Sequence, residues 1–452
     1  MHSLPFRLVM AAGLFFLISC RVHRTGDNSR LSHAAEEFIN DSLFTNAHLG
    51  ISVFDPVKRD FLIDHQGDKY FIPASNTKII TCFVGMKYLG DSIPALEWKD
   101  VDSAIILRPT GDPTLLHPDY MDQPAIDLLR SLTKKMYMDT SAWQEHALGP
   151  GWSWDDYNDD YSAERSAFPV YGNVIRWHQA RTKKEYPRDD SDTIDTFLFS
   201  EPDLNWQVDI SPPSPDHVFR VRRDLSENRF LVSEGQETEA VIDVPFLTHG
   251  VRSAVELLAD TVHRYIGVLK GKYPASDFTL VRSRPVDSML KPMMHRSDNF
   301  FAEQTLLMVG STITGEMNDK GGIHALLQQE LSGFPDKPVW VDGSGLSRYN
   351  LFTPHDFIWL LNKMRQEVRW ERITDVFSTG GFGNRGNDHP EDKDRIHAKS
   401  GSMSGVLCLS GFLVARSGRT LLFSILLNNY TRPIGPVRSR IQKLLYHLIE
   451  DN

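Results

Sequence analysis

The sequence predicts an α/β (α+β) fold, in which an antiparallel sheet flanked by helices is interrupted by smaller, inserted β-rich domains. Both ends of the chain combine apolar strands with helices, whereas residues 178–240 are polar and rich in Asp, Arg, Pro and Ser. The chain has 452 residues. Single cores stop growing beyond about 250–300 residues, so we expect two or three domains.

The N-terminal part predicts two strands and a buried helix. Residues 47–54 and 61–63 form apolar strand patterns, and an extended segment at 70–73 leads to Ser75. The apolar residues that continue the helix after Ser75 are Ile79, Ile80, Phe83 and Val84.

The C-terminal part predicts a hairpin and a final helix. Residues 411–415 and 420–427 are apolar β runs joined by the turn 416–419. The last segment places Ile441, Leu444, Leu445, Leu448 and Ile449 on one helical face. In the middle, helices are expected at 251–266 and from about 299 to 309, and short alternating strands within 178–240.

The first twenty residues predict a secretory leader. His2 and Arg7 precede an apolar run, 8–18, that is too short to span a bilayer. The run ends at Leu17-Ile18-Ser19-Cys20, which resembles the bacterial lipobox, so Cys20 is the expected lipidation site. The expected location is periplasmic, with the lipid as the only membrane anchor. A plain signal peptide or an uncleaved anchor is the alternative.

Composition excludes several function classes. The formal net charge of −10 gives the chain no general attraction for phosphate backbones, so nucleic acid is not an expected partner. The sequence contains no His-Glu-x-x-His and no Cys/His cluster with zinc spacing, so we expect no metal and no cofactor. Cys82 and Cys408 lie in apolar runs and are expected to be buried free thiols.

The first candidate for chemistry is Ser75-Asn76-Thr77-Lys78. On a helix, Lys78 lies one turn after Ser75 and can take its proton if burial and positive neighbours keep the amine neutral. Ser131-Leu132-Thr133-Lys134 and Ser288-Met289-Leu290-Lys291 have the same spacing. The extended lead-in and the buried helix favour Ser75.

Two further segments carry side chains suited to proton transfer or substrate binding. In Ser297-Asp298-Asn299, the hydroxyl could pass a proton to a leaving amine and the amide could hold substrate; the alternative is a helix N-cap. Lys399-Ser400-Gly401-Ser402 begins the last strands and suits a peptide carboxylate, with glycine permitting close approach; the alternative is a turn of small residues. The Ser75 and Ser402 amides could share an oxyanion.

The ordered set S-x-x-K, S-D-N and K-S-G resembles that of penicillin-recognising serine acyltransferases. In particular, the chain resembles the D-alanyl-D-alanine carboxypeptidase/endopeptidase family of low-molecular-mass penicillin-binding proteins, the type with a large insertion between the first two motifs. The resemblance extends over about residues 32–450 and includes Thr110-Gly111-Asp112-Pro113-Thr114-Leu115, Trp154-Asp155-Asp156, Tyr161-Ser162-Ala163 and Val341-Asp342-Gly343-Ser344-Gly345-Leu346-Ser347-Arg348. Ser400 stands where the family usually has Thr, which keeps the hydroxyl.

The resemblance implies a penicillin-binding-protein/β-lactamase-like transpeptidase domain. Its expected organisation is a leader (1–20), a tether (21–31), the catalytic domain (32–95 and 280–452), an inserted domain (96–177 and 241–279) and a nested β-rich insert (178–240). It also implies removal of the terminal D-Ala from peptidoglycan stem peptides, with or without cleavage of cross-links, and inhibition by β-lactam antibiotics.

The expected roles follow from the motifs. Lys78 deprotonates Ser75, Ser297 serves the leaving amine, Asn299 positions the acyl chain, and Lys399, Ser400, Gly401 and Ser402 bind the substrate carboxylate. Two alternatives stay open. Tyr171-Gly172-Asn173 matches the Tyr-x-Asn of one class of serine β-lactamase, and the chain could also be a catalytically silent cell-wall-binding lipoprotein.

Overall fold

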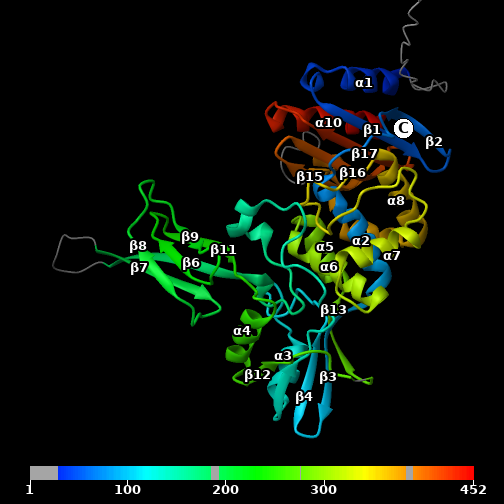
Figure 1. The fold of residues 1–452 in the computed structure, drawn as a ribbon. Coiled ribbons are helices and arrows are strands. Elements are labelled where there is room, and N and C mark those ends of the chain that lie inside the picture. The colour runs from blue at the N-terminus through cyan, green and yellow to red at the C-terminus, as the bar shows by residue number, and fades with distance from the viewer. Residues whose placement is uncertain (1–28, 185–192, 275, 383–389) are drawn as a thin grey trace, which may run out of the picture.

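The computed structural model of the chain describes residues 29–184, 193–274, 276–382 and 390–452 (Figure 1). Its central layer is a six-stranded sheet in the order β14-β15-β16-β17-β1-β2, and every neighbouring pair is antiparallel. The strands are β1 (His48–Asp55), β2 (Asp60–His65), β14 (Ser378–Thr379), β15 (Ile396–Met403), β16 (Val406–Val414) and β17 (Thr420–Asn428).

Helices cover both faces of this sheet, which explains why β16 and β17 are apolar at nearly every position (Figure 1). Because side chains alternate along a strand, Leu407 and Leu409 pack toward one face and Val406 and Cys408 toward the other. The first face is covered by α1 (Ser29–Ile39) and α10 (Ile434–Glu450). The helices on the other side are α2 (Lys78–Tyr88), α5 (Asp287–His295), α6 (Asn299–Thr314), α7 (Asp319–Gln328), α8 (Pro354–Glu367) and α9 (Trp370–Val376).

The chain between α2 and α5 forms three further sheets with a hydrophobic cluster of their own. A five-stranded sheet, in the order β12-β5-β4-β3-β13, consists of β3 (Ser92–Val101), β4 (Ala104–Pro109), β5 (Lys135–Met138), β12 (Ile266–Val268) and β13 (Thr279–Pro285). It is accompanied by α3 (Pro124–Ser131) and α4 (Arg252–Val262). The two three-stranded sheets comprise β6 (Val174–Lys184), β7 (Thr193–Glu201) and β11 (Glu239–Pro245), and β8 (Val208–Ser211), β9 (Arg220–Arg223) and β10 (Phe230–Ser233).

The expected fold class is confirmed, with a few differences in detail. The hairpin β16–β17 and the buried face of α10 form as the sequence predicts. The helix expected to reach Ile266 ends at Val262, because His263 adopts a left-handed conformation with φ 53° and Ile266 starts β12 instead. Cys82 and Cys408 are buried free thiols. Within the described residues, no helix combines the length and apolar composition needed to cross a membrane.

Candidate active site

Ser75 lies in a 3-10 turn, Ala74–Thr77, immediately before α2. The sequence placed it at the start of the helix itself, whereas the α-helix begins at Lys78. The turn is fixed by the Thr77 hydroxyl, which donates to the Ala74 carbonyl at 2.9 Å, and Ala74 has a positive φ of 47°. Residues 78–86 of α2 are buried, while Ser75 remains half-buried. The packed helix therefore anchors a hydroxyl that solvent can still reach.

The Lys78 amine is fully buried and contacts three neutral groups. Its Nζ lies 2.6 Å from Asn299 Oδ1, 2.8 Å from the Ser344 carbonyl oxygen and 3.1 Å from Ser75 Oγ. A neutral amine has two hydrogens and one lone pair. The amide and carbonyl oxygens can only accept, so they take both hydrogens, and the lone pair is left for the Ser75 hydroxyl. This arrangement suits a base acting on Ser75.

Burial lowers the pKa of Lys78 from 10.5 to about 8. Glu303, Asp342 and Asp298 act in the opposite direction, since their negative charges favour the ammonium form. Desolvation outweighs them, so a substantial fraction of the amine is neutral in mildly alkaline solution. The sequence-based requirement for a depressed lysine pKa is met mainly by burial.

The second motif forms the start of α6. Asp298 is the N-cap, and its carboxylate accepts from the Phe301 amide at 2.9 Å. The cap interpretation is therefore correct for Asp298, but the residues on either side of it take part in the site. Asn299 accepts from Lys78 through Oδ1 and donates through Nδ2 to the Tyr161 carbonyl at 2.9 Å.

The third motif lies on β15. Lys399 Nζ is 3.0 Å from Ser297 Oγ and 2.7 Å from the Ser400 carbonyl oxygen. The lysine is buried, and its pKa is held well below 10.5 by desolvation and then by the positive charge of Lys78. Ser297 and Lys399 thus connect the second and third motifs directly, and Asn299 and Lys78 connect the first and second.

Gly401 explains how closely β15 approaches Ser75. A Cβ built on Gly401 would lie 2.6 Å from the Pro73 carbonyl oxygen and 2.9 Å from the Ser75 nitrogen. Only glycine permits this contact without displacement. Ser400 is half-buried and Ser402 exposed along the same strand. The carboxylate-binding residues expected from the sequence therefore lie on the strand that contacts the backbone of Ser75.

Comparison with known proteins assigns the chain to a protein family. The model of the D-Ala-D-Ala carboxypeptidase 3 (S13) family matches residues 31–445, which is nearly the whole chain. The chain belongs to this family. It is therefore a serine-type D-Ala-D-Ala carboxypeptidase of the penicillin-binding-protein type, as the motifs indicated.

The relatives of this S13 carboxypeptidase are distant but similar over most of their length. A D-alanyl-D-alanine carboxypeptidase from Actinomadura sp. (strain R39) is 25% identical over an alignment 457 residues long, which covers 90% of this chain and 82% of that protein. A crystal structure of penicillin binding protein 4 (dacB) from Haemophilus influenzae matches with a TM-score of 0.72 at 19% identity, over 93% of this chain and 98% of that one. A structure of the same protein in complex with a β-lactam matches with a TM-score of 0.69 at 18% identity, over 93% of this chain and 99% of that one. These structures share the fold.

The other S-x-x-K segments and the Tyr-x-Asn segment of the S13 chain lie away from the site around Ser75. Ser131 Oγ donates to the Leu128 carbonyl at the exposed end of α3, and Lys291, the lysine of the third S-x-x-K, pairs with Asp375 at 2.5 Å. Tyr171 Oη is bonded to Thr261 Oγ1 on α4 at 2.7 Å, and the Asn173 side chain accepts from the Val170 amide and donates to the Glu164 carbonyl. The side chains of the Tyr-x-Asn segment are thus hydrogen-bonded within the insert. Cys20, the expected lipidation site, lies outside the described residues.

Residues of two other segments also contact the site, and sequence reasoning assigned them no role. The Ser344 carbonyl accepts from Lys78, and Glu303, one turn after Asn299 on α6, accepts from the Ser344 amide at 2.7 Å. The sequence contains a feature that points to each of these two residues. The stretch 341–348 resembles a signature of the family, and the i, i+4 spacing places Glu303 on the same helix face as Asn299.

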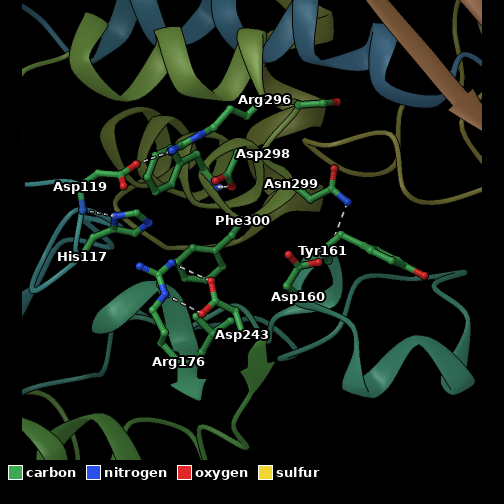
Figure 2. A pocket seen from close by; sticks show the side chains of 14 residues that line it. His117, Asp119, Asp160, Tyr161, Arg176, Asp243, Arg296, Asp298, Asn299 and Phe300 are labelled. Atoms are coloured by element: carbon green, nitrogen blue, oxygen red, sulfur yellow. Dashed lines mark hydrogen bonds and ion pairs between the residues drawn. The ribbon is translucent and has the colours of Figure 1, made fainter. Parts of the chain in front are cut away.

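A cavity of about 380 Å³ lies beside the second motif, lined by residues 297–301 and by strands of the insert (Figure 2). Four of its charged lining residues form the ion pairs Arg176–Asp243 at 2.8 Å and Arg296–Asp119 at 2.5 Å, and Asp160 and Asp298 also line it. Figure 2 shows Asn299 directed at Tyr161 on one side of this space. Ser297 and Asn299 line the cavity, whereas Ser75, Lys78 and Lys399 do not, so the cavity meets the site on the side of the second motif.

Proposed function

We propose that Ser75 is the acyl-enzyme nucleophile of this S13 carboxypeptidase and that Lys78 is its general base. The observation that carries the proposal is the position of Lys78 Nζ, 3.1 Å from Ser75 Oγ with its two other contacts to oxygen acceptors. Ser75 Oγ forms a bond to the carbonyl carbon before the terminal D-Ala, and its proton passes to Lys78. The Ser75 and Ser402 amides stabilise the oxyanion.

Collapse of the intermediate breaks the carbon–nitrogen bond. Ser297 donates its proton to the departing amine, and the proton held on Lys78 passes to the Ser297 oxygen, so Lys78 is neutral again. A water molecule then attacks the acyl carbon and transfers one proton to Lys78. As the bond to Ser75 Oγ breaks, Lys78 returns that proton to Oγ and the shortened peptide is released. Asn299 holds the acyl chain through its amide while it orients Lys78.

Lys399, Ser400 and Ser402 receive the terminal carboxylate of the stem peptide. The buried Lys399 amine contacts only neutral oxygens among its hydrogen-bond partners, and its pKa is depressed. A bound carboxylate supplies the negative charge that favours its ammonium form. The same strand can receive the carboxylate of a penicillin, whose leaving group stays tethered after acylation.

The N-terminal segment, which contains Cys20, is the last part of the proposal. We infer that Cys20 is lipidated and that residues 21–31 are a peptide tether between the lipid and the enzyme. The enzyme acts on peptidoglycan stem peptides in the periplasm. The expected division into a catalytic domain, an inserted domain and a nested insert is supported by the separate hydrophobic cluster of the insert. Its bounds stay as predicted from the sequence. Loss of radiolabelled-lipid incorporation in Cys20→Ala, compared with an unchanged Cys82→Ala, tests the lipidation.

Mass spectrometry of the folded protein after penicillin treatment tests the nucleophile. We expect one penicillin adduct on the peptide that contains Ser75, and none in Ser75→Ala. Ser288→Ala, which removes the serine of another S-x-x-K, is the matched control and should retain the adduct. Product release from D-Ala-D-Ala peptides distinguishes the enzyme from a silent binding module, and slow deacylation distinguishes it from a β-lactamase. An unmodified Ser75 in folded protein contradicts the proposal.

A further inference from the structure

The insert reaches the neighbourhood of Lys78 through a buried arginine. Arg165 is 1% exposed, and its guanidinium lies 3.4 Å from Glu303 Oε2 on α6 and 2.6 Å from Asp319 Oδ2 on α7. A third carboxylate, Glu145 Oε1, lies 3.4 Å from it, and the guanidinium also donates to the carbonyls of His146 and Leu148. A buried cation needs such partners, because desolvating an unpaired charge is costly. Arg165 is thus a counter-ion shared by three carboxylates, one of which, Glu303, lies on the helix that carries Asn299.

Glu303 and Asp342 hold the backbone that contacts Lys78. Glu303 Oε1 accepts from the Ser344 amide at 2.7 Å, and Asp342 Oδ1 accepts from the Gly345 amide at 2.9 Å. The Ser344 carbonyl, which shares a peptide plane with the Gly345 amide, accepts from Lys78 at 2.8 Å. The peptide unit that takes one hydrogen of the amine is therefore fixed on both sides.

A second side chain of the insert holds the other carboxylate. Trp152 Nε1 donates to Asp342 Oδ2 at 3.0 Å, and the Arg165 guanidinium lies 5.6 Å from the centre of the Trp152 ring. Tyr161, between them in sequence, accepts from Asn299. Three residues of the segment 152–165 thus contact groups that either bind Lys78 or orient its acceptors.

We propose that Glu303 is a positioning residue for the general base Lys78, and that Arg165 of the insert is the counter-ion that keeps Glu303 in place. The inference rests on the proposed function, since it assigns a role only if Lys78 is the base for Ser75. On this view the insert is part of the catalytic apparatus as well as a neighbouring domain.

The charge of Glu303 has a chemical purpose that a neutral side chain would not serve. Burial alone would lower the pKa of Lys78 further, and the resulting amine would be a weaker base. The charged groups that face Lys78 are Glu303 and Asp298 from α6, Asp342 from the loop and Lys399 from β15. The carboxylates oppose the effect of burial. Burial and the charge of Asp342 raise the pKa of Glu303 itself to about 7, against the effect of Arg165, so Glu303 carries its charge mainly above pH 7.

The test measures the second-order rate constant for penicillin acylation of Ser75 in the full chain from pH 5.5 to 9.5, with thermal unfolding recorded for each variant. Glu303→Gln keeps an oxygen acceptor for the Ser344 amide but removes the charge. We expect the midpoint of the pH profile to be lowered by about one unit and the maximal rate to fall modestly, because the neutral amine is then a weaker base. Glu303→Leu removes the acceptor too and should lower the maximal rate at least about tenfold.

Asp356→Asn is the matched control. Asp356 is also a buried carboxyl group with a raised pKa, but it bonds Thr353 at the start of α8 and does not contact Lys78. Its pH midpoint should equal that of the wild type. A folded Glu303→Leu with wild-type rate and midpoint, or an unshifted Glu303→Gln, overturns the inference while leaving the proposed function intact. A wild-type protein that penicillin does not acylate at Ser75 overturns the proposed function itself.

Discussion

Lys78 and Asn299 are joined by a 2.6 Å hydrogen bond, although 221 residues separate them along the chain. The bond connects the first turn of α2 to the first turn of α6, and these two helices pack side by side (Figure 1). Asn299 takes one hydrogen of the amine and the Ser344 carbonyl takes the other. The direction of the remaining lone pair thus depends on contacts that only the folded chain provides.

Replacing the proposed base should abolish acylation without unfolding the protein. Lys78→Met is expected to slow penicillin acylation of Ser75 by about 10²–10⁴-fold, the usual contribution of a general base. Its melting temperature should not fall, since an apolar side chain of similar length replaces a buried amine. Lys291→Met, which alters the exposed lysine of another S-x-x-K, should retain the wild-type rate. Equal rates in the two variants would exclude Lys78 as the base.

The acylation rate should rise with pH through about 8. The ammonium form of Lys78 has no lone pair, so below its pKa of about 8 the rate should fall about tenfold for each pH unit. Stopped-flow measurement with a chromogenic cephalosporin gives this profile. A rate that is flat between pH 6 and 9 would contradict the assignment.

The same pKa shift has a consequence for stability. The pKa of Lys78 is lower in the folded state than the reference value of 10.5, so between about pH 8 and 10.5 the unfolded chain binds more protons. The destabilisation from Lys78 is therefore full below pH 8 and disappears toward pH 10.5. Chemical denaturation should show Lys78→Met gaining most relative to wild type below pH 8. A gain that increases above pH 8 would show that the sign is wrong.

The approach of β15 to Ser75 should not tolerate a side chain. In Gly401→Ala the new Cβ would collide with the Pro73 carbonyl and the Ser75 amide, at a cost of about 1–3 kcal/mol in the free energy of unfolding. Displacement of the strand should also lower the acylation rate. Gly435→Ala, on α10 with open space around the new Cβ, is the control and should leave both quantities unchanged. Denaturant titration and acylation kinetics measure the two effects.

The Tyr-x-Asn alternative makes the opposite prediction for two hydroxyls. Tyr171→Phe loses only the bond to Thr261, so acylation and peptide release should remain near wild type. Ser297→Ala removes the hydroxyl 3.0 Å from Lys399 and should reduce both by about 10²-fold or more. Rates on a D-Ala-D-Ala peptide and on penicillin decide between them. A severe loss in Tyr171→Phe with an active Ser297→Ala would support the alternative.

Local patterns of the sequence determined much of the architecture. Apolar runs on β16 and β17 and the spaced leucines of α10 predicted the layered unit, since periodic burial is encoded by neighbouring residues. The three motifs were also visible, and the extended lead-in and the buried helix after it favoured Ser75 over Ser131 and Ser288. The end of α4 was misjudged, because an apolar Ile266 continues the helical pattern although the backbone turns at His263.

Tertiary structure alone decided how the site is completed. Short spacing could join Ser75 to Lys78, but the contacts of Lys399 with Ser297, of Glu303 with Ser344 and of Arg165 with Glu303 each bring together residues that are distant along the chain. Such pairs have no local periodicity, and burial, which lowers the pKa of Lys78, is a property of the packed whole. The sequence by itself therefore supplied the reactive groups and their family, and the fold supplied the electrostatic setting in which an amine can act as a base.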